Sequence, residues 1–336
     1  MKRVEIELEV LTPMFSYGDR KVVEFRITEL KSLMRSIFRE IYYFENLDDM
    51  RNKEGYLFGT TSNIDKSFKK ESSIKSPVSF VIKDNIKREN IYEECILPHK
   101  KDKINPIKCI KGSTKVWLNM ICKKNIDVEI YIKLLLQVSI MGAIGRRSRK
   151  GFGSFKINEI KIDGKNEYQD TLKKNPIDIL KDTYKNGEYS MRKIEISELE
   201  VKFQEVNNEL NYPYIKKLIL INIKNDRDYL QLISNISQLT HDRVHEYNDF
   251  TEKIDNKEKI NKNVLGNCNK QLKRFASPIC VSFWENDDNK YMIIKELNYN
   301  YIYNKLNIRG ENEQQANKDY VNKYVEELIK IGKGKK

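Results

Sequence analysis

The chain has 336 residues, with 62 lysines and arginines against 49 aspartates and glutamates, so its formal net charge is +13. With 39% hydrophobic and 33% charged residues, it has enough apolar material for about two domains of ordinary size and is not a disordered tail. The longest uncharged apolar stretch, Leu134 to Gly145, has twelve residues, whereas a membrane-spanning helix needs about 20. The sequence therefore predicts no membrane-crossing segment.

The first five residues, Met1-Lys2-Arg3-Val4-Glu5, lead directly into alternating charge and lack the apolar core of a secretion signal. We therefore expect a cytoplasmic protein. No two cysteines form a CxxC pair, so their spacing is typical of neither a zinc site nor a secreted disulfide framework. We expect buried free thiols at all five positions, which are Cys95, Cys109, Cys122, Cys268 and Cys280.

The basic excess is concentrated in one half of the chain. Residues 1–165 carry 33 basic and 22 acidic side chains, whereas residues 166–336 carry 29 and 27. Lysine, asparagine and isoleucine are over-used throughout, but such a bias would spread evenly. The localised excess therefore predicts a surface in the first half that binds a polyanion.

The first 165 residues predict an alternation of strands and helices. Apolar and charged residues alternate over Arg3–Val10, which predicts a half-buried strand. A helix capped by Thr28 follows, because apolar residues recur at helical spacing from Leu30 to Phe44. The other predicted segments are an extended piece at Val22–Ile27, strands at Pro77–Ile82, Thr114–Cys122 and Phe152–Ile162, and a helix at Val128–Met141. Their order is the ferredoxin-like βαββαβ pattern.

A polar stretch from Asp163 to Ser190 is the best candidate for a boundary, with a short helix predicted at Ile177–Tyr184. We expect a first domain at 1–165, a linker at 166–193 and a second domain at 194–336. The second part predicts strands at Lys217–Ile223, Ile279–Trp284 and Tyr291–Leu297, and helices at Asp228–Leu239, Tyr247–Ile260 and Gln315–Ile331. We therefore expect an α+β protein of two ferredoxin-like domains, the second degenerate.

The segment from Gly142 to Gly153 combines glycines with cations between a predicted helix and a predicted strand. Glycines allow positive φ, so that backbone amides can converge on an anion, and the cations add attraction for phosphate. The alternative is a solvated charged turn whose glycines only serve its shape. No Gly-Lys-Ser/Thr occurs in the chain, so this is not a nucleotide-binding Walker loop. The residues that we expect to bind are Gly145, Arg146, Arg147, Arg149, Lys150, Gly151 and Gly153.

A second basic feature lies on the first predicted helix. Lys31, Arg35 and Arg39 follow one another at intervals of four residues, so they form a stripe along one side of the helix. Arg26 lies just upstream and extends the stripe. The alternative is that these cations form surface ion pairs with nearby carboxylates, for which the candidates are Glu24, Glu29, Glu40 and Glu45.

These segments resemble the RAMP superfamily of CRISPR effector subunits, and within it most closely the subunit-one family of the type III-B Cmr complex. The resemblance rests on short motifs scattered over about the first 160 residues, together with Arg274-Phe275-Ala276-Ser277-Pro278 in the second half. Ser32 stands where the family usually has glycine after the helix lysine. The motifs of the first half are Leu11-Thr12-Pro13-Met14-Phe15, Glu24-Phe25-Arg26, Leu30-Lys31-Ser32-Leu33-Met34-Arg35 with Arg39, Leu57-Phe58-Gly59-Thr60 and the segment Gly145 to Gly153.

The resemblance implies a non-catalytic protein, without cofactor or metal, that holds guide RNA and target RNA near the guide's 3′ end beside other Cmr subunits, in antiviral defence. Because guides differ in sequence, such a subunit is expected to contact phosphates and riboses more than base edges. Tyr17, Trp117 and Phe152 are able to stack on unpaired bases, but we expect them to pack within the protein.

The main alternative is a metal-independent endoribonuclease that processes CRISPR transcripts, and a weaker one is a generic basic interaction protein. The chain has three histidines, His99, His241 and His245, and none lies in residues 1–98, where such a nuclease commonly carries its general acid or base. We expect His241 and His245 in surface or capping roles. The acidic pairs Asp48-Asp49 and Asp287-Asp288 are expected in polar loops, and Asp19 is assigned no role.

Overall fold

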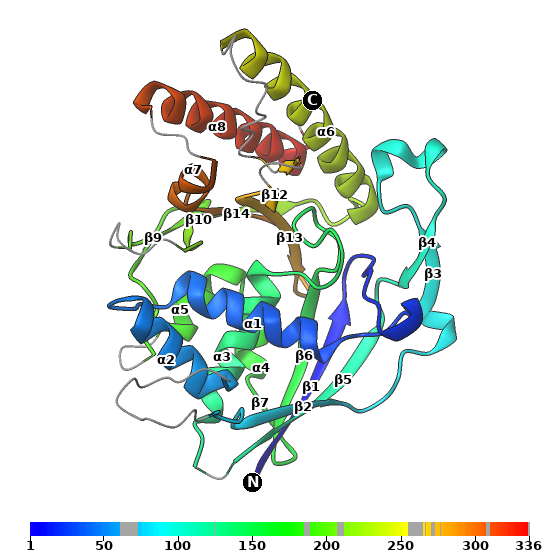
Figure 1. Cartoon of the computed structure of the whole chain (residues 1–336). Coiled ribbons are helices and arrows are strands. Elements are labelled where there is room, and N and C mark those ends of the chain that lie inside the picture. Colours follow the sequence, from blue (N-terminus) through cyan, green and yellow to red (C-terminus); the bar gives the residue numbers. More distant parts are fainter. Residues whose placement is uncertain are drawn as a thin grey trace.

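The computed structural model describes residues 1–60, 73–123, 125–184, 189–206, 212–254, 265, 267–269, 273–275, 277–306 and 310–334. Within these residues the fold is α+β, with two five-stranded antiparallel sheets and two small two-stranded sheets. The first sheet belongs to the amino-terminal half and the second to the carboxy-terminal half (Figure 1).

The first sheet has β1 (Lys2–Val10) near its centre, with Ile6 opposite both Leu118 and Ile160. Alternation along β1 buries one row of side chains under helices, while Glu5, Glu7 and Glu9 lie on the other face with lysines of the neighbouring strands. The predicted strands are confirmed here. The sheet order is β2 (Val78–Ile82), β5 (Lys115–Cys122), β1, β6 (Phe155–Ile162) and β7 (Lys165–Glu167).

Helices α1 (Ile27–Ile41) and α3 (Val128–Met141) pack on each other, as their apolar periodicity predicts. Helix α1 starts after Arg26 rather than at a Thr28 cap, and it ends at Ile41 instead of Phe44. A further helix that was not predicted, α2 (Leu47–Phe58), follows with Asn46 as its cap. The acidic pair Asp48-Asp49 therefore lies in the first turn of α2, where carboxylates stabilise a helix, and not in a loop.

Between β2 and β5 the chain forms a hairpin of β3 (Ile91–Glu94) and β4 (Ile107–Ile110), which also was not predicted. The short 3-10 helix η3 (Pro98–Lys103) lies between its strands, and it contacts α6 (Tyr229–Ile254) of the second half. Two other 3-10 turns are η1 (Asp19–Lys21) and η2 (Arg88–Asn90). The hairpin therefore links the two halves on the side of α6 (Figure 1).

The predicted linker is a packed part of the fold. It adds β7 to the first sheet, and α5 (Pro176–Thr183) packs on α3, close to the predicted helix. The short helix α4 (Gln169–Leu172) packs on β6. Arg192, which is 2% exposed, donates to the carbonyls of Gln204, Glu40 and Ile215, so it joins both halves from within this segment.

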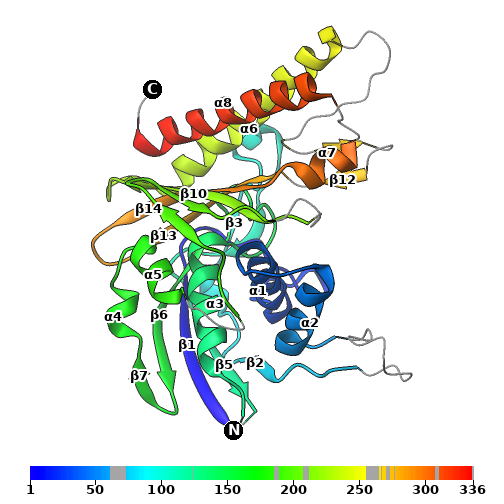
Figure 2. The same cartoon turned by 90° about the vertical axis from the view of Figure 1, so that its left-hand side faces the viewer.

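The second sheet has the order β13 (Ile279–Glu285), β14 (Lys290–Leu297), β10 (Ile215–Ile223), β9 (Glu200–Phe203) and β8 (Ile194–Ile196). It lies between the first half and a layer formed by α6 and α8 (Glu311–Lys333) (Figure 2). The helices predicted at Asp228–Leu239 and Tyr247–Ile260 fall in a single helix, α6, as far as Ile254. The predicted residues 255–260 lie outside the described ranges. The smaller elements are α7 (Asn300–Leu306), β11 (Asn267–Asn269) and β12 (Lys273–Phe275).

The two halves share one hydrophobic core, because a single cluster of buried residues includes Leu8 and Leu30 from the first half and Leu220 and Ile293 from the second. All four cysteines whose side chains are described are buried free thiols, as predicted, while that of Cys268 lies outside the described residues. None of the described helices has both the length and the apolar composition to cross a membrane.

Candidate nucleic-acid interface

The basic stripe on α1 lies beside α2 and includes a shared carboxylate. Arg35 Nε lies 2.5 Å from Glu54 Oε1, and Arg39 lies 3.6 Å from the other oxygen of Glu54. The side chain of Glu54 is 8% exposed, whereas those of Arg35 and Arg39 are 38% and 42% exposed. One buried carboxylate thus orients two guanidinium groups and neutralises one of them. It was not among the carboxylates proposed as partners.

Lys31 continues the stripe toward the start of α1, with its ammonium 6.0 Å from the centre of the Phe80 ring. Its pKa is lowered, first by burial and then by Arg35. Arg26 differs from these residues because it lies near Glu24 at 3.9 Å and Glu29 at 3.7 Å. The ion-pair alternative therefore holds for Arg26 with two of the expected carboxylates, and for Arg35 and Arg39 with Glu54, which was not among them. Lys31, Arg35 and Arg39 together still carry more positive charge than Glu54 offsets.

The glycine-rich loop from Gly142 to Gly153 is shaped by close backbone contacts. Gly145 has φ +92°, and a Cβ there would lie 2.7 Å from the carbonyl oxygen of Phe15. Gly153 has φ +72°, and a Cβ there would collide with the carbonyl of Ile144. Gly145 is thus required where the loop crosses the segment after β1, and Gly153 where the end of the loop passes its own beginning.

Several amides of this loop are used within the protein. The amides of Ile144, Arg146, Lys150 and Gly153 donate to the carbonyls of Gly153, Phe15, Arg147 and Pro13, respectively. They are therefore not directed at a ligand, and the expectation that the loop amides converge on an anion is wrong for these four. The cationic side chains of the loop, rather than these four amides, are therefore its candidates for binding phosphate.

The four cations of the loop divide into two pairs. Arg149 donates to the carbonyl of Ser277 at 2.5 Å, and Lys150 donates to the hydroxyl of Tyr324 at 3.2 Å. Both contacts are with the second half, and Gly151 lies against Phe283. The expectation of a loop exposed over its whole length is therefore wrong for Gly151, which is buried, and holds only in part for Arg149 and Lys150, which are partly exposed beside the second half. Arg146 is exposed, and Arg147 is partly exposed.

The exposed part of the loop lies next to the start of α1. The amide of Arg146 bonds to Phe15, and the hydroxyl of the next residue, Ser16, donates to Glu29 on α1 at 2.9 Å. Further along the helix, a Cβ on Gly142 would meet the side chain of Leu33. The loop therefore borders α1 on the side of Glu29 and Leu33, whereas Lys31, Arg35 and Arg39 lie on the side of α2 and β2. We refer to the cations of α1 and of this part of the loop together as the α1–loop surface: Arg26, Lys31, Arg35, Arg39, Arg146 and Arg147.

Two histidines from distant parts of the chain meet at the other side of Arg147. His99 on η3 and His241 on α6 are stacked, with ring centroids 4.6 Å apart and an angle of 24° between the rings. His241 is partly exposed, in keeping with a surface role, and its contact with His99 was not predicted. The side chain of His245 lies outside the described residues. Sequence reasoning missed this pair, although the basic run Pro98-His99-Lys100-Lys101 was a signal that could have drawn attention to it.

Among the aromatic candidates, Phe152 is 1% exposed and packs edge-on against Phe15, so its expected packing role is confirmed. Tyr17 is partly exposed, and its hydroxyl donates to the carbonyl of Lys108 at 2.6 Å. Trp117 lies on the open face of the first sheet, with the ammonium groups of Lys83 and Lys161 at 5.7 Å and 5.3 Å from its ring.

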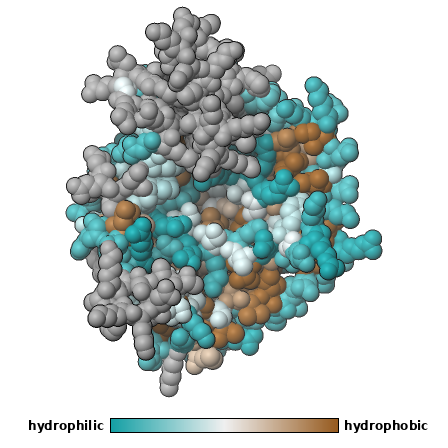
Figure 3. Space-filling model, viewed as in Figure 1, coloured by the Kyte–Doolittle hydropathy of each residue, from teal (hydrophilic) through white to brown (hydrophobic). Residues whose placement is uncertain are grey.

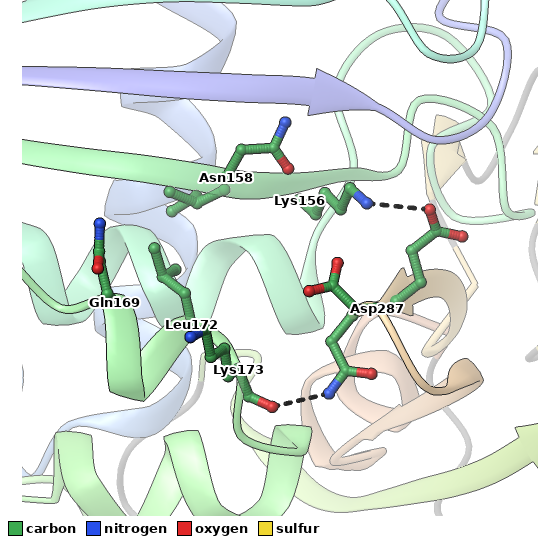
Figure 4. A pocket seen from close by; sticks show the side chains of 9 residues that line it. Lys156, Asn158, Gln169, Leu172, Lys173 and Asp287 are labelled. Carbon is green, nitrogen blue, oxygen red and sulfur yellow. Dashed lines mark hydrogen bonds and ion pairs between the residues drawn. The ribbon is translucent and has the colours of Figure 1, made fainter.

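A cavity of about 310 Å³ lies where α4 and β6 face the turn between β13 and β14. Lys156 approaches Glu285 at 3.2 Å across it, and the side-chain amide of Asn286 donates to the carbonyl of Lys173 (Figure 4). Its walls carry Lys156 and Lys173 against Glu285 and Asp287, so the charges balance. It contains none of the predicted site residues, and it offers no excess of positive charge to a polyanion.

Among the residues that Figure 3 colours by hydropathy, hydrophilic side chains surround several hydrophobic patches. Among the described residues, no cluster of three or more histidine, cysteine, aspartate or glutamate side chains is arranged to hold a metal ion.

The comparisons with known proteins agree with the motifs. Residues 7–156, which include α1 and the glycine-rich loop, match the model of the RAMP superfamily, so the predicted resemblance is confirmed over this segment. No curated protein matches the chain. Among solved structures, the crystal structure of Cmr1 from Pyrococcus furiosus (apo form) has a TM-score of 0.53 and 16% identity, covering 89% of this chain and 88% of that chain.

A second structure, the type III-B Cmr-beta bound to cognate target RNA, has a TM-score of 0.50 and 13% identity over 91% of this chain and 99% of the matched chain. At these identities the likeness concerns the fold. The chain therefore has the fold seen in Cmr1, and the segment that matches the RAMP model contains the whole α1–loop surface.

Proposed function

We propose that this chain is an RNA-binding structural subunit of a type III-B CRISPR (Cmr) effector complex, which contacts guide RNA, target RNA or both near the guide's 3′ end. Three findings support the proposal: the RAMP match, the fold shared with Cmr1, and the α1–loop surface within the matched segment. One of the similar structures is described as bound to cognate target RNA. In this role the second half docks to neighbouring Cmr subunits in antiviral defence.

The observation that carries the proposal is the excess of exposed positive charge on the α1–loop surface. Arg35 and Arg39 are held by one buried carboxylate, and Arg146 is exposed at the adjacent loop. Guanidinium groups fixed in this way recognise phosphate oxygens without reading bases. A surface of this kind suits a subunit that must accept guides of any sequence.

We also propose that both halves derive from the ferredoxin-like fold, with domains at 1–165 and 194–336 joined by 166–193. The sheet order β6, β1, β5, β2 supports this for the first half, because it places the fourth and second strands of a βαββαβ unit at the two edges. In the second half, β13, β14 and β10 are arranged like β2, β5 and β1, and β9 occupies the position of the fourth strand.

The alternative of a metal-independent endoribonuclease gains one specific observation, the pair His99 and His241. A general acid and a general base must reach the attacking and leaving oxygens on either side of a phosphate. With ring centroids 4.6 Å apart, the two rings are in contact, and a phosphate has no room between them. The geometry therefore favours binding over cleavage, and we propose a protein without catalytic activity.

Incubation of the chain with labelled repeat RNA in the presence of EDTA tests this choice. We expect retention of intact RNA, and cleavage would favour the endoribonuclease. Fluorescence anisotropy with a short single-stranded RNA should give a logarithmic salt slope near −3 if about four phosphates are engaged, from roughly −0.7 per phosphate.

The double variant R146E/R147E should weaken this binding steeply. The matched control K165E/K202E changes the same number of charges at exposed positions on β7 and β9, and it should bind almost as the wild type does. Equal losses in both variants would reject the α1–loop surface as the binding site.

A further inference from the structure

The contact between His99 and His241 joins the β3–β4 hairpin to the second half, directly beside the glycine-rich loop. Nδ1 of His99 lies 2.7 Å from the hydroxyl of Ser237 on α6, and Ser237 is 4% exposed. The hydrogen bond to Ser237 therefore fixes the Nδ1 edge of the His99 ring. The imidazoles of His99 and His241 are both partly buried. This arrangement fixes the position of the ring and leaves Nε2 as its second polar atom.

Positive groups from three elements face this pair. Lys100 comes from η3, His241 from α6 and Arg147 from the loop, and each of them lowers the pKa of His99 after the larger effect of burial. Asp242 on α6 is the one acidic group that acts on His99 in the opposite direction. Without a bound anion, the folded protein thus favours neutral His99, and protonation of His99 as the pH falls opposes folding.

We propose that His99, His241, Arg147 and Lys100 form a second phosphate-binding site, which takes a backbone phosphate of single-stranded RNA beyond Arg146. The inference rests on the proposed function and extends the RNA path from α1, across the loop, to the edge between η3 and α6. The backbone of Arg147 supports this path, because it has φ +58° and its carbonyl accepts from the amide of Lys150. The backbone of Arg147 is thereby held in a tight turn next to Arg146.

The negative charge of a phosphate at this site would outweigh the repulsion that the neighbouring cations exert on a protonated imidazole. It attracts the protonated form that the neighbouring cations disfavour, so RNA binding and proton uptake are coupled. RNA affinity should therefore increase as the pH falls through the imidazole range. If binding raises the pKa of one histidine by about one unit, the affinity changes by about tenfold.

The test measures anisotropy with a short single-stranded RNA at about pH 5.5 and about pH 8, on either side of the ordinary histidine pKa of about 6.5. The wild type should bind about tenfold more tightly at the lower pH. The variants H99N and H241N should lose most of this gain in affinity between about pH 8 and about pH 5.5. Asparagine at position 99 retains a polar atom near the Nδ1 position for Ser237, which limits structural loss.

The outcomes separate the second site from the proposed function. Tight RNA binding with the same pH dependence in wild type and both variants would overturn the second site alone. Absence of RNA binding at either pH would overturn the proposed function and the second site together. As a measurement on the unaltered chain, NMR titration of the imidazole Cε1 protons should show a higher pKa for His99 or His241 with RNA than without, and unchanged values would also overturn the second site.

Discussion

At the scale of single residues, neighbours in the sequence have opposite roles. Arg146 and Arg149 are separated by two residues in the same glycine-rich segment, yet Arg146 is exposed and Arg149 donates to the carbonyl of Ser277. Ser277 is 6% exposed, and its carbonyl loses this donor when Arg149 is replaced. The cations of this segment thus serve two different purposes. Arg146 presents its charge to solvent, and Arg149 contacts the second half.

The variant R149Q should lower the free energy of unfolding by about 1–3 kcal/mol, because the carbonyl of Ser277 loses a charged donor in a buried setting. R146Q, at an exposed position, should change it by less than about 0.5 kcal/mol. Chemical denaturation of both variants measures the difference. Equal stability of the two variants would contradict the inward role of Arg149.

At the scale of elements, α1 serves the core, the charged surface and the contact between the halves. Its apolar side buries Leu30, Met34 and Phe38 in the first half, while the cationic stripe lies beside α2. Near its end, Glu40 forms a buried ion pair with Lys295 of β14 at 2.7 Å. The core, α2 and Lys295 together fix the position of α1. Because the cations on α1 are then already ordered, less conformational entropy is lost when RNA binds.

The triple variant K31A/R35A/R39A should weaken RNA binding by a similar factor for unrelated sequences, because phosphate contacts carry no base information. The control variant for this triple substitution is E54Q, which removes the buried carboxylate between Arg35 and Arg39 and keeps all three cations. It should bind RNA at least as tightly as the wild type. Anisotropy with several RNA sequences measures both effects, and a loss confined to one sequence would contradict phosphate contact.

At the scale of the whole molecule, the halves form one cooperative unit. They share a hydrophobic cluster, and the pair of Glu40 with Lys295 is 6–7% exposed at the side chains. Arg192 adds hydrogen bonds to Glu40 and Ile215 from the predicted linker. A buried charge whose partner is removed is strongly destabilising, so this junction should respond sharply to a single substitution.

The wild type should unfold in a single calorimetric transition. K295M should reduce the free energy of unfolding by about 3–5 kcal/mol, whereas E40Q/K295M, which leaves no unpaired charge, should recover part of the loss. Two separate transitions in the wild type would contradict a shared core, and equal stability of the single and double variants would contradict the role of the pair.

The sequence alone predicted those helices and strands whose own residues show a clear hydrophobic pattern. Strand β1 and helix α1 follow from periodicity, because each buries one clear apolar row or face. Helix α3 follows from its nearly continuous apolar sequence, and it is buried on almost every side. Helix α2 escaped prediction since its stripe is interrupted by polar residues, including Glu54, whose burial depends on Arg35 and Arg39. The hairpin of β3 and β4 escaped because its strands are short and because η3 between them is held by α6, a distant segment.

For the candidate site, the sequence by itself determined the residue types, the glycines required at tight backbone crossings and the excess of charge in the first half. The tertiary structure decided which cations are exposed, because exposure depends on the distant segments that cover each side chain. It turned Arg149 and Lys150 toward the second half, placed Glu54 between two arginines, and brought His99 to His241 across 142 residues of sequence. Local pattern specifies the chemistry of each segment, and only packing between distant segments specifies which groups meet and which face solvent.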